Sequence, residues 1–261
     1  MRGRSVCGVC ASWTRVLELT PLLGLSWQNP VAERDAPPIS FQREPRVRIG
    51  VARDKAFSFY CEDNFDVLRE NGAEIVPFSP VADAELPPDL DGLYPGGGYP
   101  ELHADALSRN ASMCAGVHAF ANAGKPVYAE CGGMIYLGKS LTTLDGHGYT
   151  MTGPFPMEFE MTPRLVHFGY VDVEFVEDCI LGAKGTRVRG HSFHCSRVRA
   201  GGVIPTAYHL KYSLSGREEP EGYRFKNVLA SYVHIHFRAN PLLARSLVMV
   251  ARRAQGVEVP A

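Results

Sequence analysis

Residues 126–140, PVYAECGGMIYLGKS, contain a short β-rich run, a turn with two glycines and a segment suited to a helix. We expect a strand over 125–130 and a helix over 132–141, so the stretch is one strand–turn–helix unit. Two chemistries fit such a unit. Residues 133–140 (GMIYLGKS) satisfy the phosphate-loop pattern G-x-x-x-x-G-K-[ST] of nucleotide hydrolases. Residues 129–133 (AECGG) match a sharp strand-to-helix turn that presents a cysteine nucleophile.

The phosphate-loop interpretation requires small, pliable residues, because successive backbone N–H groups must wrap around the phosphate. The variable positions carry bulky side chains instead, namely Met134, Ile135, Tyr136 and Leu137. A helix that starts at Gly132 would place Lys139 about two turns inside it, away from a phosphate at the helix N-terminus. No aspartate at the end of a later strand stands out as a magnesium ligand. These features argue against a nucleotide site in this stretch.

The thiol interpretation requires small residues two positions before and after the nucleophile, because the strained turn brings those backbones together. Ala129 and Gly133 meet this requirement. Cys131 would then lie at a helix N-terminus, where the helix dipole favours the thiolate, and the amide of Gly132 could point at a developing oxyanion. An isolated cysteine is more often a buried structural residue, but this setting favours catalysis. We predict that Cys131 is a nucleophile.

The segment between residues 47 and 141 alternates strands with helices. We expect strands at 47–52, 74–78 and 125–130 and helices at 61–71, 104–123 and 132–141, while residues 91–94 lead into the glycine turn at 95–98. Pro77 makes the second strand edge-like or ends it early, and Gly72 closes the first helix. Strands and turns dominate after Met151. The chain is therefore predicted to be an α/β protein with a mostly parallel central sheet flanked by helices, a flavodoxin-like arrangement. Reactive groups in such folds lie in the turns at 95–98 (PGGG) and 130–133 (ECGG).

Residues 1–44 differ from the rest of the chain. Asn29-Pro30 and Ala36-Pro37-Pro38 interrupt any regular element there. We interpret this segment as an N-terminal extension or linker, the remnant of whatever precedes the packed domain. The packed domain itself is expected to cover residues 45–261, with its first strand starting near Arg46.

Composition excludes several classes of protein. The chain has 261 residues, is 45% hydrophobic and 21% charged, and has a formal net charge of -1. This balance gives no reason to expect nucleic acid or an anionic membrane as a partner. No apolar run approaches the roughly 20 residues that span a bilayer, so we expect a cytoplasmic protein. Seven scattered cysteines do not form the framework of a disulfide-rich fold.

A thiol nucleophile requires a base, and histidine is the usual choice. His234 and His236 lie in an alternating run at 229–237, which we expect to be one strand with both rings on one face. His191 and His194 lie in RGHSFH, and His167 stands alone. Only Cys195, beside His194, adds a ligand with suitable spacing, so we expect no metal site. A pair formed by Cys131 and His234 is the favoured constellation.

Five sequence blocks resemble the glutamine amidotransferase domain of cobyrinic acid a,c-diamide synthases, enzymes of cobalamin biosynthesis. They follow the order of that family and extend over about four-fifths of the chain. Together they are much more specific than any single motif. The blocks are VARDKAFSFYCEDNFDVL (51–68), DGLYPGGGYPELHA (91–104), PVYAECGGMIYLG (126–138), RGHSFHCS (189–196) and NVLASYVHIHF (227–237).

The resemblance implies roles for individual residues. Cys131 matches the nucleophile that attacks the side-chain amide of glutamine, forms a glutamyl thioester and releases ammonia. His234 matches the histidine that raises the nucleophilicity of the thiol. Gly97 and Gly98 match a turn whose amides, together with that of Gly132, would hold the oxyanion. His236 fits the role of His234 less well by its position in the motif, and we expect His236, His191 and His194 to be candidates for accessory roles.

The chain departs from the family pattern at two positions. Many related amidotransferases have a glutamate two residues after the histidine, and here that position is His236. We therefore expect a dyad, or an orienting group from elsewhere. The family usually reads G-H-E-F-H where this chain has Gly190-His191-Ser192-Phe193-His194. The loss of that carboxylate concerns substrate or glutamine recognition rather than the nucleophile.

The full-length family carries an N-terminal ATP-binding domain that activates the corrin carboxylates, and nothing like it occurs in this sequence. The resemblance implies that the chain binds no cofactor itself, that ATP and magnesium belong to a partner or missing domain, and that the acceptor is a corrinoid. This chain would perform the glutaminase half, as part of a split enzyme, a truncated product or a subunit. Two alternatives remain: an amidotransferase for nickel-sirohydrochlorin or a cell-wall precursor, and a catalytically silent fragment or binding subunit.

Overall fold

The computed structural model of the chain describes residues 46–200 and 202–255. The predicted extension at 1–44 lies outside these residues. Within the described part, no helix is both long and apolar enough to cross a membrane.

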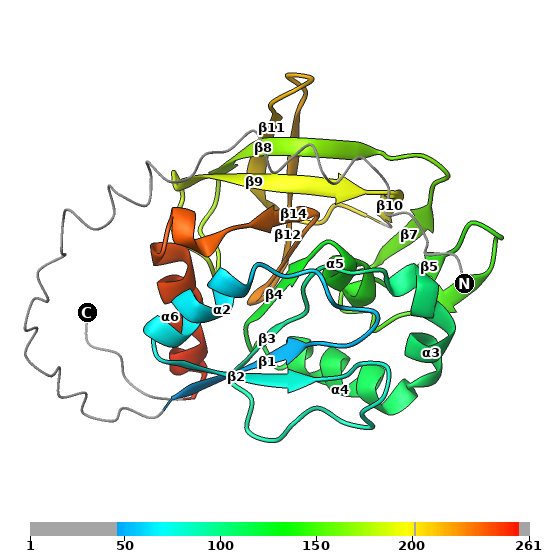
Figure 1. The fold of residues 1–261 in the computed structure, drawn as a ribbon, viewed down its shortest axis with the longest axis horizontal. Helices are drawn as coiled ribbons and strands as arrows, with labels where there is room; N and C mark the ends of the chain where they lie inside the picture. The colour runs from blue at the N-terminus through cyan, green and yellow to red at the C-terminus, as the bar shows by residue number, and fades with distance from the viewer. Residues whose placement is uncertain (1–45, 201, 256–261) are drawn as a thin grey trace, which may run out of the picture. The chain divides into compact units, whose positions relative to one another are not determined.

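A ten-stranded sheet runs through the described domain, in the order β14-β9-β8-β11-β12-β13-β4-β3-β1-β2 (Figure 1). The strands β13, β4, β3, β1 and β2 are parallel, and the remaining pairs are antiparallel. The α/β class with a helix-flanked sheet is confirmed, and the parallel part predicted from the sequence continues into an antiparallel part. The strands are β1 (Val47–Ala52), β2 (Ala73–Phe78), β3 (Gly92–Tyr94), β4 (Val127–Glu130), β8 (His167–Phe175), β9 (Arg187–His194), β11 (Thr206–Tyr212), β12 (Glu218–Phe225), β13 (Val228–Ser231) and β14 (Val233–Ile235).

Helices cover both faces of the parallel part. The helices are α2 (Glu62–Glu70), α3 (Ala104–Arg109), α4 (Ala111–Asn122), α5 (Gly132–Leu137) and α6 (Leu242–Ala254). One buried cluster joins α2 and α6 to alternate residues of the sheet, such as Ile49 and Tyr128. The other cluster joins α3, α4 and α5 to the intervening residues, such as Val127 and Ala129. Figure 1 shows the two groups of helices on opposite sides of the sheet. Each fully buried large apolar side chain stabilises this arrangement by about 1.5–3 kcal/mol.

A smaller sheet packs beside the end of α5. It has the order β10-β7-β5-β6 and consists of β5 (Ser140–Thr142), β6 (Gly148–Thr150), β7 (Met157–Met161) and β10 (Ser196–Ala200). Two 3₁₀ turns complete the described elements, η2 (Pro100–His103) and η3 (Phe237–Ala239).

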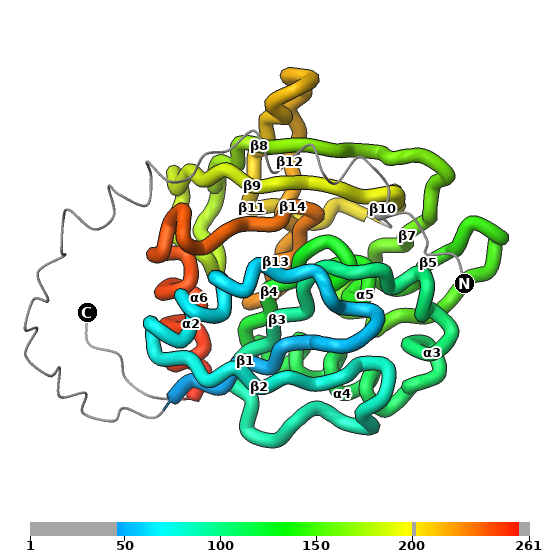
Figure 2. Tube along the Cα trace, in the orientation of Figure 1, coloured from blue at the N-terminus to red at the C-terminus, as the bar shows by residue number. Residues whose placement is uncertain are grey.

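Several predicted elements are confirmed. The first strand has the predicted bounds, and α2 ends at Glu70 with Gly72 following at a positive φ of 92°, a conformation that glycine adopts without strain. The second strand lies at the edge of the sheet, as Pro77 predicted. β13 lies directly beside β4, although about a hundred residues separate them in the chain (Figure 2).

Two predicted helices are wrong in extent. The segment 104–123 forms two helices, because the Asn110 side chain caps α4 at the Met113 amide and also donates to the carbonyls of Pro80 and Asp83. The helix after Cys131 ends at Leu137 rather than 141. Lys139 therefore lies outside the helix.

That helix ends just before Gly138, where the chain turns toward the smaller sheet and packing requires a glycine. A Cβ atom on Gly138 would lie 2.4 Å from the Phe159 ring, and Gly138 has an extended conformation that directs the chain into β5. The amide of Lys139 donates to Met157 O at 2.8 Å, and its ammonium group pairs with Glu158 at 3.1 Å. Both the backbone amide and the side chain of Lys139 are therefore bound to residues of the smaller sheet.

The single strand predicted over 229–237 is also wrong. The chain forms β13, bends at Tyr232 and then forms β14, which pairs with β9 rather than with β4. Buried Glu221 holds the bend by accepting hydrogen bonds from the Tyr232 amide at 2.7 Å and the Ser231 hydroxyl at 2.5 Å. This bend carries His234 away from the sheet interior toward the end of β4.

Candidate active site

Cys131 lies at the carboxyl end of β4 and caps the N-terminus of α5. Its backbone has φ 47° and ψ -101°, a conformation that non-glycine residues rarely adopt and that clusters at functional sites. The Cys131 amide donates to Ser231 O at 2.7 Å, which ties the turn to β13. The neighbouring strand thus helps to hold the strained turn, and the turn directs the thiol out of the sheet at the start of a helix.

Glycines allow the turn at 95–98 to pack directly on the turn at 130–133. A Cβ atom on Gly133 would lie 1.9 Å from Pro95 O, so only glycine fits at this position. The Gly133 amide donates to Gly96 O at 2.8 Å, and the Glu130 amide donates to Pro95 O at 3.1 Å. The structure therefore brings together the two turns that the sequence singled out.

The three glycines predicted to hold an oxyanion have different surroundings. The amide of Gly97 already donates to Phe59 O at 3.2 Å, which removes it from the predicted set of donors. Gly97 instead leaves room for the histidine, because a Cβ atom there would lie 2.5 Å from His234 Cε1. Gly98 lines the pocket in front of the thiol. Gly132 is the first residue of α5, where helical N–H groups have no partner in the preceding turn.

His234 lies beside Cys131, on β14. Its side chain is 10% exposed and its Nδ1 atom is 3.6 Å from Glu130 Oε2. Burial lowers the pKa of His234, but hydrogen bonds with the Cys131 and Glu130 side chains and the negative charges of both groups raise that pKa to about 10. The ring is therefore an imidazolium at neutral pH, held between a thiol and a carboxylate.

Glu130 is the site residue that sequence reasoning missed. It precedes the nucleophile on β4, is 2% exposed, and accepts hydrogen bonds from Tyr94 Oη at 2.7 Å, Tyr128 Oη at 2.6 Å and the Ile235 amide at 3.0 Å. A sequence signal existed, since a glutamate at the end of an otherwise apolar strand is rarely buried without a partner.

The other predicted histidines fall into two groups. His236 lies beyond the end of β14, does not line the pocket and pairs with Asp63 at 3.4 Å, so it is not an accessory group of the thiol. His191 is opposite His234 in the β9–β14 register and lines the pocket, and burial followed by the charge of His234 lowers its pKa. His194 also lines the pocket.

His194 is held in its neutral form. Its ring stacks on Tyr232 with centroids 3.7 Å apart, and its Nδ1 atom is 3.0 Å from Ser196 O. Burial lowers the pKa of His194 to about 4, although the hydrogen bond with Ser196 opposes this shift. A neutral, stacked ring forms part of the pocket wall rather than a proton donor.

Ser192 stands where the resembling family has a glutamate. Its side chain is fully buried, its Oγ atom has no hydrogen-bond partner within the described residues, and it does not line the pocket. The substitution at this position therefore affects the interior of the sheet and not the wall that faces the thiol.

A pocket of about 330 Å³ opens in front of Cys131, at the small end of the range for ligand sites. Its wall is mostly apolar, and of the described residues that line it Glu101 is the one with an acidic side chain. Burial raises the pKa of Glu101. The lining residues are Phe59, Gly98, Tyr99, Glu101, Cys131, Ile135, Met161, His191, Phe193, His194, Cys195, Ser196 and His234.

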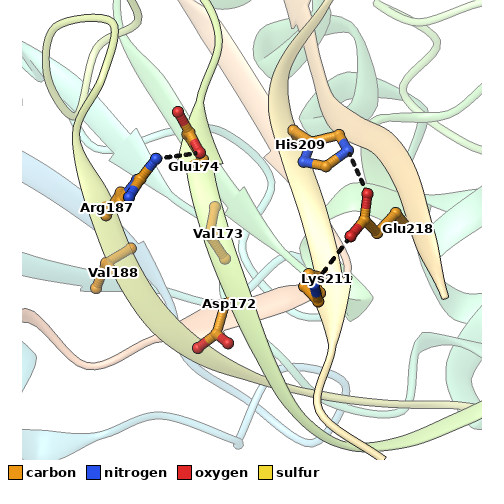
Figure 3. A pocket seen from close by; sticks show the side chains of 8 residues that line it. All are labelled: Asp172, Val173, Glu174, Arg187, Val188, His209, Lys211 and Glu218. Carbon is orange, nitrogen blue, oxygen red and sulfur yellow. Dashed lines mark hydrogen bonds and ion pairs between the residues drawn. The ribbon is translucent and has the colours of Figure 1, made fainter. Parts of the chain in front are cut away.

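A larger depression is lined by residues of β8, β9, β11 and β12 (Figure 3). Its charged groups are already paired: Arg187 with Glu174 at 3.0 Å, and Glu218 with both Lys211 and His209. Among the described residues, no cysteine, serine or threonine lines it. Among residues 46–200 and 202–255, no group of three or more potential ligands is placed to hold a metal ion.

A cysteine at a strained strand-to-helix turn, beside a buried histidine on an α/β sheet, is an arrangement suited to nucleophilic catalysis by the thiol. Solved structures share the fold. A crystal structure of a glutamine amidotransferase aligns over 80% of this chain and 99% of its own, with a TM-score of 0.55 at 21% identity. PurLQS from Thermotoga maritima aligns over 80% of this chain and 99% of the matched chain, with a TM-score of 0.55 at 14% identity.

The chain belongs to the family of CobB/CobQ-like glutamine amidotransferase domains, whose sequence model matches residues 48–242. It is 40% identical over 241 residues to the cobyrinate a,c-diamide synthase of Syntrophotalea carbinolica, covering 91% of this chain and 52% of that protein. The corresponding enzyme of Listeria monocytogenes is 42% identical over 230 residues, covering 87% and 50%. The resemblance drawn from the five blocks is confirmed, and the chain spans about half the length of these relatives.

Proposed function

We propose that this domain hydrolyses glutamine through a thioester at Cys131 and supplies the ammonia for ATP-dependent amidation of the a and c carboxylates of cobyrinic acid. The observation that supports it most is the contact between the Cys131 thiol and the imidazolium of His234 at the end of β4. The ATP, the magnesium and the corrinoid belong to a partner domain or subunit in this proposal. No residue of the present site is assigned to them.

The proposed chemistry follows from the charges in the site. The Cys131 thiolate attacks the side-chain carbonyl carbon of glutamine, and the amides of Gly98 and Gly132 stabilise the oxyanion. His234 gives its proton to the departing nitrogen, so ammonia leaves and a glutamyl thioester remains. The neutral ring then takes a proton from water, whose hydroxide displaces the thiolate and yields glutamate. One glutamine and one water become one glutamate and one ammonia.

The proposal predicts a high alkaline limit of activity. The proton that reaches the nitrogen resides on His234, whose pKa is about 10, so kcat at saturating glutamine is maintained at neutral pH and falls as pH rises through about 10. An unperturbed histidine would lose this proton near pH ~6.5. Initial rates of glutamate formation, measured from neutral pH to above pH 10, test this prediction. A decline centred near the ordinary histidine pKa would contradict it.

Glu101 is the group proposed to bind the α-ammonium of glutamine, because it is the acidic side chain of the pocket wall. A hydrogen bond to a charged group contributes about 1.5–3 kcal/mol, so Glu101→Gln raises KM for glutamine roughly 10- to 100-fold and changes kcat little. Steady-state kinetics of glutamate release measure both constants. The matched control is Glu62→Gln, whose carboxylate pairs with Arg53 at 2.5 Å and does not line the pocket. An unchanged KM in Glu101→Gln would remove this residue from the proposal.

Exposed rings around the pocket support contact with a partner. Phe59, Tyr99 and Phe193 line the pocket and are 52%, 49% and 40% exposed. The Phe168 ring, 57% exposed, lies 6.0 Å from that of Phe193. Exposed apolar groups gathered at the mouth of a site are typical of interaction surfaces. A synthetase domain that covers this rim would also keep ammonia from escaping into solvent.

The proposed function is tested by glutamate release from glutamine by the purified chain, with asparagine as the control substrate. The expected result is release of glutamate and ammonia in equal amounts from glutamine, with little reaction of asparagine, whose amide is one methylene nearer the backbone. Adding the N-terminal half of a matched synthase, its acceptor and ATP is expected to raise the rate and transfer the amide nitrogen to the acceptor. Absence of hydrolysis under both conditions would contradict the proposal.

A further inference from the structure

The segment that carries His234 is held from two sides by buried carboxylates. On one side, Glu130 accepts the Ile235 amide at 3.0 Å and lies 3.6 Å from His234 Nδ1. On the other side, Glu221 accepts the Tyr232 amide at 2.7 Å and does not contact the imidazole ring. Asn64 completes the support, because it donates to Ile235 O at 2.8 Å. The backbone around His234 is therefore fixed by side chains, and one of them also reaches the ring.

We propose that Glu130 is the positioning residue of the thiol–imidazole pair: its carboxylate holds the Nδ1–H of His234 and directs Nε2 toward Cys131. The inference deepens the function proposed above and rests on it for the role of His234. It assigns the orienting task to the residue just before the nucleophile, on β4. Many related amidotransferases have a glutamate two residues after the histidine. In this chain that position is His236, and its ring pairs with Asp63.

Two tyrosines keep the carboxylate of Glu130 in place. Tyr94 donates to Oε2 at 2.7 Å and Tyr128 donates to Oε1 at 2.6 Å, and both hydroxyls are buried. The carboxylate is thus hydrogen-bonded through both oxygens, which offsets the unfavourable burial of its charge. One carboxylate oxygen of Glu130 accepts the Ile235 amide, and the other faces the ring of His234. Glu130 thereby holds both the backbone of β14 and the imidazole.

Few other charges act on the ring of His234. Cys131 contacts it from the start of α5, and its negative charge acts in the same direction as that of Glu130. His191 faces it from β9, and its lowered pKa leaves that ring neutral near neutral pH. Glu101 lines the same pocket from η2, and its pKa is raised by burial. Within the described residues, Glu130 is the buried carboxylate that contacts the ring.

The test is the titration of His234 by NMR in the full chain labelled with ¹⁵N-histidine, with the resonances assigned from a His234→Asn sample. Removing the charge of Glu130 by Glu130→Gln is expected to lower the midpoint of the His234 titration by roughly 1–3 pH units, the usual effect of an opposite charge at this distance. The matched control is Glu221→Gln, which removes an equally buried carboxylate from the other side of the same bend. Its His234 midpoint is expected to stay within about half a unit of the unmodified chain.

The tautomer of the neutral His234 ring in the unmodified chain is a second test, which does not depend on the folding of a variant. If Glu130 holds Nδ1–H, the ring keeps a proton on Nδ1 in both charge states and titrates at Nε2, so the neutral form is the Nδ1–H tautomer. A neutral ring protonated on Nε2, or an unchanged midpoint in Glu130→Gln, would overturn the proposal. Neither measurement uses glutamine, so a failure of the proposed glutaminase reaction is distinguishable from a failure of this inference.

Discussion

Cys131→Ala is expected to abolish glutamine hydrolysis, with a loss of kcat on the order of 10⁵-fold or more, because no thioester can form without the thiol. The substitution removes one sulfur from a turn whose backbone bonds, from the Cys131 amide to Ser231 O and from the Gly133 amide to Gly96 O, remain available. Alanine therefore tests the chemistry without demanding a new fold. Glutamate release is measured over hours, so that a very low residual rate of the variant can be detected.

The matched control for this prediction is Cys114→Ser. Cys114 is a half-buried thiol on α4 whose sulfur lies 3.8 Å from Tyr136 Oη, and it does not line the pocket. Burial raises the pKa of Cys114, so this thiol stays protonated and unreactive at neutral pH. We expect full hydrolysis in this variant. Hydrolysis that persists in Cys131→Ala would remove the thioester from the account.

His234→Asn is expected to reduce kcat/KM for glutamine by roughly 10²–10⁴-fold, the usual contribution of a general acid–base group. Asparagine retains a polar group of similar reach but supplies no proton to the departing nitrogen. The thiolate also loses its counter-ion, so alkylation of Cys131 by a small neutral electrophile should slow at neutral pH. Parallel measurements of hydrolysis and alkylation separate these two effects.

His236→Asn serves as the control for His234, since His236 is two residues away and pairs with Asp63 outside the pocket. Its hydrolysis is expected to stay within about twofold of the unmodified chain, as is usual for a surface substitution away from the site. Equal losses in the two variants would show that the segment, rather than the ring of His234, matters for activity.

The turn that carries the nucleophile could be predicted because its requirements are local. Ala129, Cys131 and Gly133 are close in sequence, and the small residues at both ends of the turn follow from sterics alone. Structure adds the reason for Gly133, whose Cβ atom would collide with Pro95 O. The α/β class followed in the same way from alternating elements of the first half of the domain.

A glutamate at the end of an apolar strand signals that Glu130 needs partners, but the identity of those partners could not be predicted, because they are distant in sequence. Glu130 meets Tyr94 across 36 residues and Ile235 across 105 residues. The bend at Tyr232 depends on Glu221, which lies on β12, across the β12–β13 hairpin. Gly97 was correctly placed near the site, but for a different reason: it makes room for the histidine, while its amide is bonded to Phe59. Long-range contacts of this kind have no signature in a single sequence.

The reaction of the Cys131 thiol with glutamine is best tested by mapping where a glutamine-analogue electrophile becomes attached. The chain is treated with the analogue, with and without excess glutamine, digested and analysed by mass spectrometry. We expect one modified peptide, the one that contains Cys131, and we expect excess glutamine to prevent its modification. Absence of a label on Cys131, or labelling of several cysteines to the same extent whether or not glutamine is present, would contradict it.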